Sequence, residues 1–405
     1  MEMTAPKIYS DFGDSHRKVT VLGSTGSIGC NTLDLIGRNP SAFSVGAITG
    51  NKNIELLAAQ AKKFFPEMAV IGDEAGYQDL KNLLAGSGVE VAAGSDALIE
   101  AADRPSDIVM AGIVGIAGLA PTLAAARRGA IVALANKECL VCGGDMLLEQ
   151  VDQNNATLLP VDSEHNAIFQ VFDFNQSEKV DRLILTASGG PFRETDITAM
   201  AIVTPAEAVA HPNWDMGAKI SIDSATMMNK GLELIEAYYL FPVDEKQIEI
   251  LVHPQSVVHS LVSYIDGSVL AQMGTPDMRT PISYALAWPH RMATPAKRLE
   301  LEKNSELVFK TPDYNKFPAL TIARDALKAG RGAPIILNAA NEVAVQCFLE
   351  EKIGFLDITK VTEMVLNRLS QSTRQNSPAT IEEIGEVDIR ARGEAEEVAR
   401  SLHAK

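Results

Sequence analysis

Short apolar runs alternate with amphipathic stretches over the first third of the chain. Between the runs, apolar residues such as Ile28, Leu33 and Ile36 recur at the spacing of helices that pack against a sheet. Strands and helices that alternate in this order form a doubly wound parallel sheet. The β-branched and aliphatic runs that predict its strands are residues 18–22, 43–49, 68–71, 108–113 and 131–134.

The pattern changes in the rest of the chain. Further strand-like runs occupy residues 180–186, 248–252, 257–264 and 269–273, and from about residue 318 the apolar spacing becomes helical. We therefore predict an α/β chain of three domains. They are a parallel-sheet domain at 1–162, a central α+β domain at 163–287 and, after a linker at 288–313, a helical bundle at 314–405.

Composition and charge narrow the class of protein. A chain of 405 residues with 46% apolar residues is expected to form two or three globular domains. The net charge of −16 argues against a nucleic-acid binder, which would carry a basic face. Four cysteines give no disulfide framework and indicate reduced thiols in a cytoplasmic protein.

No targeting or membrane segment is expected. The first 18 residues contain no apolar core, so they do not form a secretory signal. Residues 108–126 carry no charge and are about as long as a membrane span. Three glycines and Pro121 interrupt them, however, so we predict a strand, a turn and a helix that ends near Arg127.

The first apolar run leads directly into a glycine-rich loop and an amphipathic helix. In this arrangement the glycines allow a tight turn, and the helix N-terminus faces a dinucleotide pyrophosphate. The spacing is GxxGxxG instead of the commoner GxGxxG, so a tight turn without a ligand stays an alternative. We predict a Rossmann-like domain with cofactor contacts from Gly23, Ser24, Thr25, Gly26, Ser27, Ile28 and Gly29.

The end of the second strand distinguishes between cofactors. NAD sites place an acidic residue there to bind the ribose 2′-hydroxyl. This chain has Gly50, Asn51, Lys52 and Asn53 instead. A cation and amides suit a 2′-phosphate, which favours NADPH, although Lys52 is equally compatible with a solvated loop.

Three polar residues follow the strand at 131–134. Strand ends are where open α/β sheets bind ligands. Asn136 is therefore a candidate for the nicotinamide end of the cofactor, and Lys137 for the substrate. The alternative is an ordinary helix N-terminus with a lysine in it.

Asp162 and Glu164 lie two residues apart after another apolar run. In an extended chain both would project to the same side. With a third, distant carboxylate they would suit Mg²⁺ or Mn²⁺, which prefer oxygen ligands. A solvated loop is the alternative.

Residues 189–217 have the composition of a lid. Glycines stand at both ends, and Trp214 and Met216 could cover a ligand and exclude water. Ser188 offers a hydroxyl beside flexible backbone donors, as anion sites do. Trp214 could instead pack against a neighbouring domain.

The stretch from His211 to Glu236 is unusually rich in polar residues. If it is helical after about Ser224, Asn229 and Glu233 share one face near a helix start, where anions are attracted. A well-capped helix with a solvated face is the alternative.

Taken together, these segments resemble one known family. GSTGSIG, NKE, PVDSEHNAIFQ, SGGPF, HPNWDMG, SIDSATMMNKGLE, HPQSVVHS, GTPDMRTPI and LNAANEVAV occur in this order. The order and motifs are similar to those of the 1-deoxy-D-xylulose 5-phosphate (DXP) reductoisomerases over nearly the whole chain. The resemblance implies isomerisation of DXP by retro-aldol and aldol steps. The branched aldehyde is then reduced with NADPH to 2-C-methyl-D-erythritol 4-phosphate, a step of non-mevalonate isoprenoid biosynthesis.

The resemblance also implies roles for individual residues and a homodimer. The metal, Mg²⁺, Mn²⁺ or Co²⁺, would be bound by Asp162, Glu164 and Glu233. The catalytic residues would be Lys137, Glu164, Glu233 and His211. The substrate would contact these four residues and also Ser163, Ser188, Trp214, Met216, Ser224, Asn229, Lys230, Glu236 and His259. Further cofactor contacts are expected from Asn136, Glu138, Gly217 and Met278.

Two rival functions are weaker. A metal-independent dehydrogenase of the aspartate-semialdehyde type shares the glycine loop but uses a cysteine nucleophile, and residues 163–287 contain no cysteine. A non-catalytic NADP-binding sensor would have no need for Asp162, Glu164 and Glu233 to converge.

Overall fold

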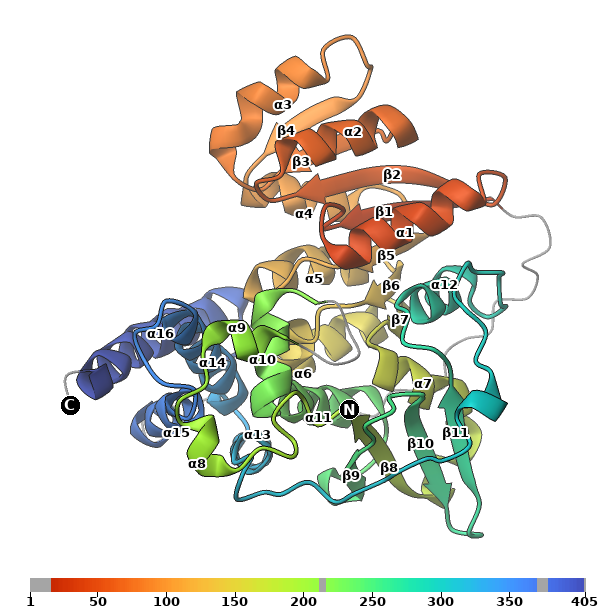
Figure 1. The fold of residues 1–405 in the computed structure, drawn as a ribbon. Helices are drawn as coiled ribbons and strands as arrows, with labels where there is room; N and C mark the ends of the chain where they lie inside the picture. The colour runs from red at the N-terminus through yellow and green to blue at the C-terminus, as the bar shows by residue number, and fades with distance from the viewer. Residues whose placement is uncertain (1–15, 211–215, 370–377, 404–405) are drawn as a thin grey trace. The chain divides into compact units, whose positions relative to one another are not determined.

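The chain groups into two compact units (Figure 1). The computed structural model describes residues 16–210, 216–369 and 378–403. Unit 1 consists of Met1–Cys139, Leu147–Phe169 and Asp277–Arg298, and unit 2 consists of Leu140–Met146, Gln170–Pro276 and Leu299–Lys405. Each unit contains its own sheet.

Seven parallel strands form the sheet of unit 1, in the order β4-β3-β2-β1-β5-β6-β7. The chain adds strands on one side from β1 to β4 and then returns to the other side of β1 with β5. Strands β3 and β5 are buried along their whole length, as expected for a parallel sheet covered on both faces. The strands are β1 (Arg17–Leu22), β2 (Phe43–Gly50), β3 (Met68–Ile71), β4 (Glu90–Ala93), β5 (Ile108–Ala111), β6 (Ile131–Leu134) and β7 (Thr157–Pro160).

Helices cover both faces of this sheet. Because crossovers between parallel strands are right-handed, α1 (Ser27–Arg38) and α2 (Ile54–Phe64) lie on one face, and α4 (Ser95–Asp103) and α5 (Leu119–Arg127) lie on the other. A helix from much later in the chain, α12 (Arg279–Ala287), packs against α1. The smaller α3 (Tyr77–Leu83) precedes β4, and α6 (Glu138–Gln153) and α7 (Ser163–Val171) flank β7.

Unit 2 has a mixed sheet in the order β11-β10-β8-β9. Its strands are β8 (Val180–Ala187), β9 (Ile248–Val252), β10 (Val258–Tyr264) and β11 (Val269–Met273). Strand β8 runs parallel to β9 and antiparallel to β10, which pairs antiparallel with β11. Two short helices, α8 (Ile197–Met200) and α9 (Pro205–Val209), follow β8 in the chain.

Helices of unit 2 pack on one another and on this sheet. Helix α11 (Met228–Leu240) packs on β8, β9 and α13 (Ala319–Ala329). Helix α14 (Ala333–Leu349) is surrounded by α13, α15, α16 and α10, which is Ala218–Thr226. Figure 1 shows α14, α15 (Asp357–Leu369) and α16 (Ile381–His403) in blue.

The predicted fold class is confirmed, since a parallel sheet, a second sheet and C-terminal helices are all present. The division into domains at 1–162, 163–287 and 314–405 stays a prediction. The apolar pattern predicted no strand at β4, a partly exposed edge strand. Within the predicted helical bundle it also marked no separate helix at α16, whose apolar stripe is diluted by acidic and basic residues. The predicted strand at 108–113 ends at Ala111.

The structure also bears on the expectations for membrane segments and disulfides. None of the helices within residues 16–210, 216–369 and 378–403 combines the length and apolar character needed to cross a membrane. The four cysteines, all among these residues, form no disulfide. Burial raises the pKa of the Cys30 and Cys347 thiols, so both are protonated at neutral pH.

Candidate active site

The glycine loop of unit 1 requires glycine at two of its positions. Gly23 has φ +78°, and a Cβ there would lie 2.6 Å from the carbonyl oxygen of Gly112, which follows β5. A Cβ on Gly29 would overlap the backbone of Ser24, so α1 could not approach the loop. The loop therefore lies where the strand order reverses, between β1 and β5, the position at which open α/β sheets bind ligands.

The N-terminus of α1 is suited to an anion. Its N-cap, Gly26, provides no side-chain hydrogen bond, and the first turn contains no acidic residue. The first backbone N–H groups of a helix have no partner within the helix and carry the positive end of its dipole. A dinucleotide pyrophosphate fits both properties.

The loop also contacts the end of β2. A Cβ on Gly50 would lie 3.1 Å from the Cγ2 of Thr25, so glycine lets the two segments approach closely. Lys52 beyond them is exposed, so its ammonium group is accessible to a ligand.

The side chains of two predicted cofactor residues form hydrogen bonds within the protein. The Ser24 hydroxyl donates to Gln60 Oε1 over 2.7 Å, and Gln60 Nε2 donates back to the Ser24 carbonyl. The Asn53 Oδ1 accepts from the backbone N–H of Leu56 over 3.1 Å, which makes Asn53 the N-cap of α2.

Asn136 shapes the loop after β5. Its amide nitrogen donates to the carbonyl oxygens of Ile113 and Gly115, the second over 2.9 Å. Its Oδ1 accepts from the Glu138 backbone N–H over 3.0 Å. The side chain thereby fixes the strand-end loop next to the glycine loop, and its predicted contact with the nicotinamide stays a prediction.

Lys137 and Asp162 form an ion pair at the ends of adjacent strands. Lys137 follows β6 and Asp162 follows β7, and their Nζ and Oδ2 atoms are 2.5 Å apart. Both side chains are largely buried, at 9% and 14% exposure. The parallel register thus brings a cation and a candidate metal ligand together at one edge of the sheet.

The local geometry predicted for Asp162 and Glu164 is wrong. Helix α7 begins at Ser163, so the chain is not extended across the pair. Glu164 lies in the first helical turn, where a carboxylate interacts favourably with the helix dipole, and accepts from the Ser163 hydroxyl over 2.6 Å.

In unit 2, the loop after β8 lies against α10. Gly189 and Gly190 have φ values of +80° and +66°, which favour glycine. A Cβ on Gly190 would lie 2.7 Å from the carbonyl oxygen of Ser224. This close approach brings the segments that carry Ser188 and Ser224, two of the predicted phosphate ligands, side by side.

The polar stretch forms two helices instead of one. Met227 has φ +64° and ends α10, and α11 begins at the next residue. The break places Asn229 and Lys230 in the first turn of α11, where both side-chain nitrogens donate to the carboxylate of Glu233. The predicted proximity of Asn229 and Glu233 is confirmed, and the predicted helix start near Ser224 is wrong.

The remaining predicted residues fall in several places. Glu236 is buried on α11, and His259 is 8% exposed on β10. Met216 and Gly217 immediately precede α10, and Met278 is the N-cap of α12. His211 and Trp214 lie outside the described residues.

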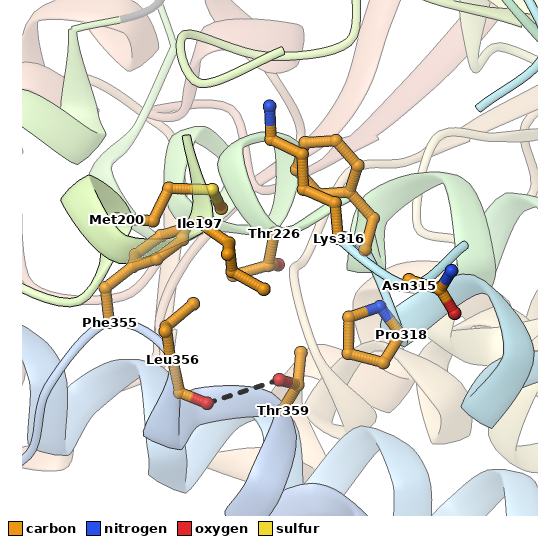
Figure 2. A pocket seen from close by; sticks show the side chains of 10 residues that line it. Ile197, Met200, Thr226, Asn315, Lys316, Pro318, Phe355, Leu356 and Thr359 are labelled. Atoms are coloured by element: carbon orange, nitrogen blue, oxygen red, sulfur yellow. Dashed lines mark hydrogen bonds between the residues drawn. The ribbon is translucent and has the colours of Figure 1, made fainter. Parts of the chain in front are cut away.

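A small cavity adjoins the end of α10 in unit 2. Figure 2 shows Ile197 and Met200 of α8 on one side of it and Leu356 and Thr359 on another. Its volume is about 150 Å³, and Thr226 of α10 forms part of its wall.

Comparison with known proteins identifies the family. A family model of 1-deoxy-D-xylulose 5-phosphate reductoisomerase matches residues 19–144, and two models of the enzyme's C-terminal domain match residues 158–241 and 273–394. A reductoisomerase of Rhodospirillum centenum is 63% identical over 90% of both chains, and one of Zymomonas mobilis is 56% identical over 96% of this chain and 99% of its own. This chain belongs to the DXP reductoisomerase family.

Solved structures of DXP reductoisomerases agree with the fold. The Zymomonas mobilis reductoisomerase in complex with NADPH is 54% identical, covers 96% of this chain and all of its own, and superposes with a TM-score of 0.90. Another, in complex with NADPH, fosmidomycin and magnesium, is 43% identical, covers 95% and 99% and has a TM-score of 0.92. The predicted family is therefore confirmed.

The donor set fits the cofactors of a DXP reductoisomerase. The glycine loop and the uncapped α1 suit a dinucleotide, as argued above. Each unit also offers carboxylates, the ligands that Mg²⁺ and Mn²⁺ prefer: Asp162 and Glu164 in unit 1, and Glu233 in unit 2.

Sequence reasoning missed the residues that support this site. Asp223, which had no assigned role, accepts from Lys219 Nζ over 2.7 Å and from Asn341 Nδ2 over 2.8 Å. Thr226 bridges the helix break, since its Oγ1 donates to the Asp223 carbonyl and accepts from the Met228 N–H. The motif that contains Asn341 was recognised, but nothing in the sequence indicated its partner 118 residues away.

Proposed function

We propose that this chain converts DXP to 2-C-methyl-D-erythritol 4-phosphate with NADPH and one divalent cation. The observation that carries the proposal is the arrangement on α10 and α11, where the helix break gathers a lysine and an amide around a buried carboxylate. Relatives of this sequence over 90% or more of the chain are DXP reductoisomerases, which supports the same activity.

The proposed phosphate grip consists of Ser188, Ser224, Asn229 and Lys230. Lys230 and Asn229 stand in the first turn of α11, where the helix dipole also favours an anion. The grip lies away from the reacting carbons, so its binding energy can drive closure of the predicted lid at residues 189–217. His211, Trp214 and Met216 belong to that lid and would exclude water from the aldehyde.

The proposed metal ligands are Asp162, Glu164 and Glu233. When bound, a divalent cation withdraws charge from the ketone oxygen and the adjacent hydroxyl oxygen of the substrate. Lys137, held beside Asp162, would donate to an oxygen that gains negative charge during bond cleavage. Ser163, Glu236 and His259 complete the proposed substrate contacts.

NADPH is proposed to bind along the glycine loop and to supply the hydride. Lys52 would contact the 2′-phosphate, and Gly50, Asn51 and Asn53 would line the same end. Asn136 is proposed for the nicotinamide end, and Glu138, Gly217 and Met278 for further contacts with the cofactor.

A coupled assay tests this function. Purified protein should oxidise NADPH only when both DXP and Mg²⁺ or Mn²⁺ are present, and mass spectrometry and NMR should identify the methylerythritol phosphate product. Equal rates after exhaustive chelation would exclude the proposed metal. Oxidation without DXP would favour another dehydrogenase.

We also propose a homodimer formed through β11. This strand is an edge of the unit 2 sheet, and Val269 and Leu270 on it are 51% and 48% exposed, with Ile265 at 65% just before it. An exposed apolar edge strand is a site at which a second strand can pair. Sedimentation analysis should give twice the chain mass, and Leu270→Lys should shift the protein towards the monomer.

A further inference from the structure

A buried carboxylate ties α10 to the C-terminal helices of unit 2. Asp223 on α10 is 1% exposed, and its two oxygens each accept one hydrogen bond. One comes from Lys219, a turn earlier on the same helix, and the other from Asn341 on α14. Since a buried carboxylate is costly without partners, these contacts constrain where α10 can lie.

The contact from Asn341 is specific. Asn341 is fully buried, and within the described residues its Nδ2 donates to Asp223 while its Oδ1 has no hydrogen-bond partner. Loss of this side chain therefore removes one hydrogen bond between α14 and α10, while the packing of the two helices on each other remains.

Helix α14 is itself tied to α16 by side chains close to Asn341 in the sequence. Asn338 donates to Glu342 over 3.0 Å, and Arg392 of α16 pairs with Glu342 at 2.5 Å. Arg392 also pairs with Asp388 of α16. These bonds hold α14 on α16, so the position of the Asn341 amide is well defined.

Packing at the end of α10 is incomplete. Thr226 lines the cavity of about 150 Å³ shown in Figure 2, so side-chain packing alone does not fix the helix on that side. On another side, Gly190 allows the Ser188 loop to touch the Ser224 carbonyl. The hydrogen bond from Asn341 is thus well placed to set the position of Ser224 opposite Ser188.

We infer that Asn341 is a positioning residue for the substrate phosphate. Through Asp223 it holds α10, and thereby Ser224, where both serine hydroxyls can reach one phosphate group. This role rests on the proposed function, because Ser188 and Ser224 are phosphate ligands only if that function is right. It assigns to the C-terminal helices a part in substrate binding.

The test compares Asn341→Ala with Asn338→Ala. Both substitutions remove a fully buried amide from α14. Among the described residues, however, Asn338 bonds to Glu342 on its own helix and not to α10. Loss of a hydrogen bond to a charged group is expected to raise the KM for DXP about tenfold in Asn341→Ala. The inhibition constant of inorganic phosphate should rise by the same factor, while the KM for NADPH stays unchanged.

Asn338→Ala should lower the melting temperature by about as much as Asn341→Ala does. It should leave the KM for DXP and the inhibition constant of inorganic phosphate unchanged. Equal shifts in the two variants, or an unchanged KM for DXP in Asn341→Ala, would overturn the inference. If Asn341→Ala does not fold, Asn341→Ser replaces it. The serine hydroxyl lies one bond closer to the backbone than the amide nitrogen that donates to Asp223, so the same rise in the KM for DXP is expected, and an unchanged KM would overturn the inference.

A second measurement separates this inference from the proposed function. Inorganic phosphate binding to wild type and variants is measured by calorimetry without DXP or NADPH. Absence of DXP-dependent NADPH oxidation in the wild type would refute the proposed function. Phosphate affinity that is equal in wild type and Asn341→Ala would refute the positioning role, even in an active enzyme.

Discussion

The glycine loop of unit 1 and the α10–α11 segment of unit 2 are both suited to bind phosphate groups, but they are built differently. The glycine loop is defined by the absence of side chains, since Gly23 and Gly29 permit contacts that a Cβ would prevent. The α10–α11 segment depends on side chains, among them Lys230 and Asn229, which converge because the helix breaks at Met227.

The two sites differ in how far apart in the sequence the residues lie that determine their structure. The strand, loop and helix of the first site follow one another within about 20 residues, so local rules are sufficient. The second site depends on a left-handed residue and on Asn341, which lies far along the chain from Asp223. Damage to the first should reduce cofactor affinity, and damage to the second should reduce turnover or substrate affinity.

The largest expected effect comes from Glu233→Gln in the second site. Glutamine keeps the size of the side chain but removes the charge that pairs with Lys230 and would bind a cation. We expect kcat to fall by a factor on the order of 10³. NADPH affinity, measured by fluorescence titration, should remain that of the wild type.

Glu249→Gln provides the matched control. Glu249 lies on β9 of the same unit and pairs with Arg182 at 3.0 Å on the surface, where ion pairs contribute little. Its kcat should not change. A large loss of NADPH affinity in Glu233→Gln would contradict the separation of the two sites.

Gly29→Ala should have the next largest effect, in the first site. The added Cβ would overlap the Ser24 backbone, and overpacking of this kind costs about 1–3 kcal/mol. If that cost falls on the loop, the Kd for NADPH rises by about ten- to a hundredfold. Titration of NADPH and a thermal melt would measure both consequences.

Gly37→Ala on the same helix is the control that distinguishes an effect on the glycine loop from an effect on α1. Its Cβ would meet only the ring of Phe64, at 3.3 Å, and alanine favours a helix over glycine by about 0.5–1 kcal/mol. We expect unchanged NADPH affinity. Equal losses in both variants would mean that α1 is sensitive to any added methyl group.

Lys52→Ala should have a smaller and more selective effect. Removal of one exposed cation from a 2′-phosphate is expected to raise the KM for NADPH about tenfold and to leave that for NADH nearly unchanged. Lys62→Ala, an exposed lysine on α2, is the control. A parallel rise for both nucleotides would show that Lys52 does not read the 2′-phosphate.

Much of the fold could be predicted because its signals are local. The runs at Met68–Ile71, Ile131–Leu134 and Ile248–Val252 coincide with β3, β6 and β9, since the first two are mostly buried apolar runs and the third alternates buried apolar residues with partly exposed ones. Edge strand β4 lacks that contrast, as does α16 with its many charges.

The candidate site was harder to derive from sequence. Asp162 and Glu164 were selected for their chemistry, but the helix that starts between them was not anticipated. Met227 gives no sign that it takes a left-handed conformation, which costs a non-glycine residue energy and is tolerated only where the surrounding structure imposes it. Asp223 remained unexplained because its partner Asn341 is brought to it only by the tertiary fold.

The smallest effect is expected at Asn53, for which the sequence and the structure indicate different roles. The sequence placed it at the 2′-phosphate, whereas in the structure its side chain caps α2. Asn53→Ala should therefore cost about 1 kcal/mol of stability, with a KM for NADPH close to that of the wild type. Asn53→Asp keeps an equally good capping oxygen and should restore the melting temperature. If Asn53 also contacts the cofactor, the new carboxylate would repel the phosphate, and Asn53→Asp would be stable but bind NADPH more weakly than Asn53→Ala. Thermal melts and NADPH kinetics on the two variants thus decide whether the Asn53 side chain only caps α2 or also contacts NADPH.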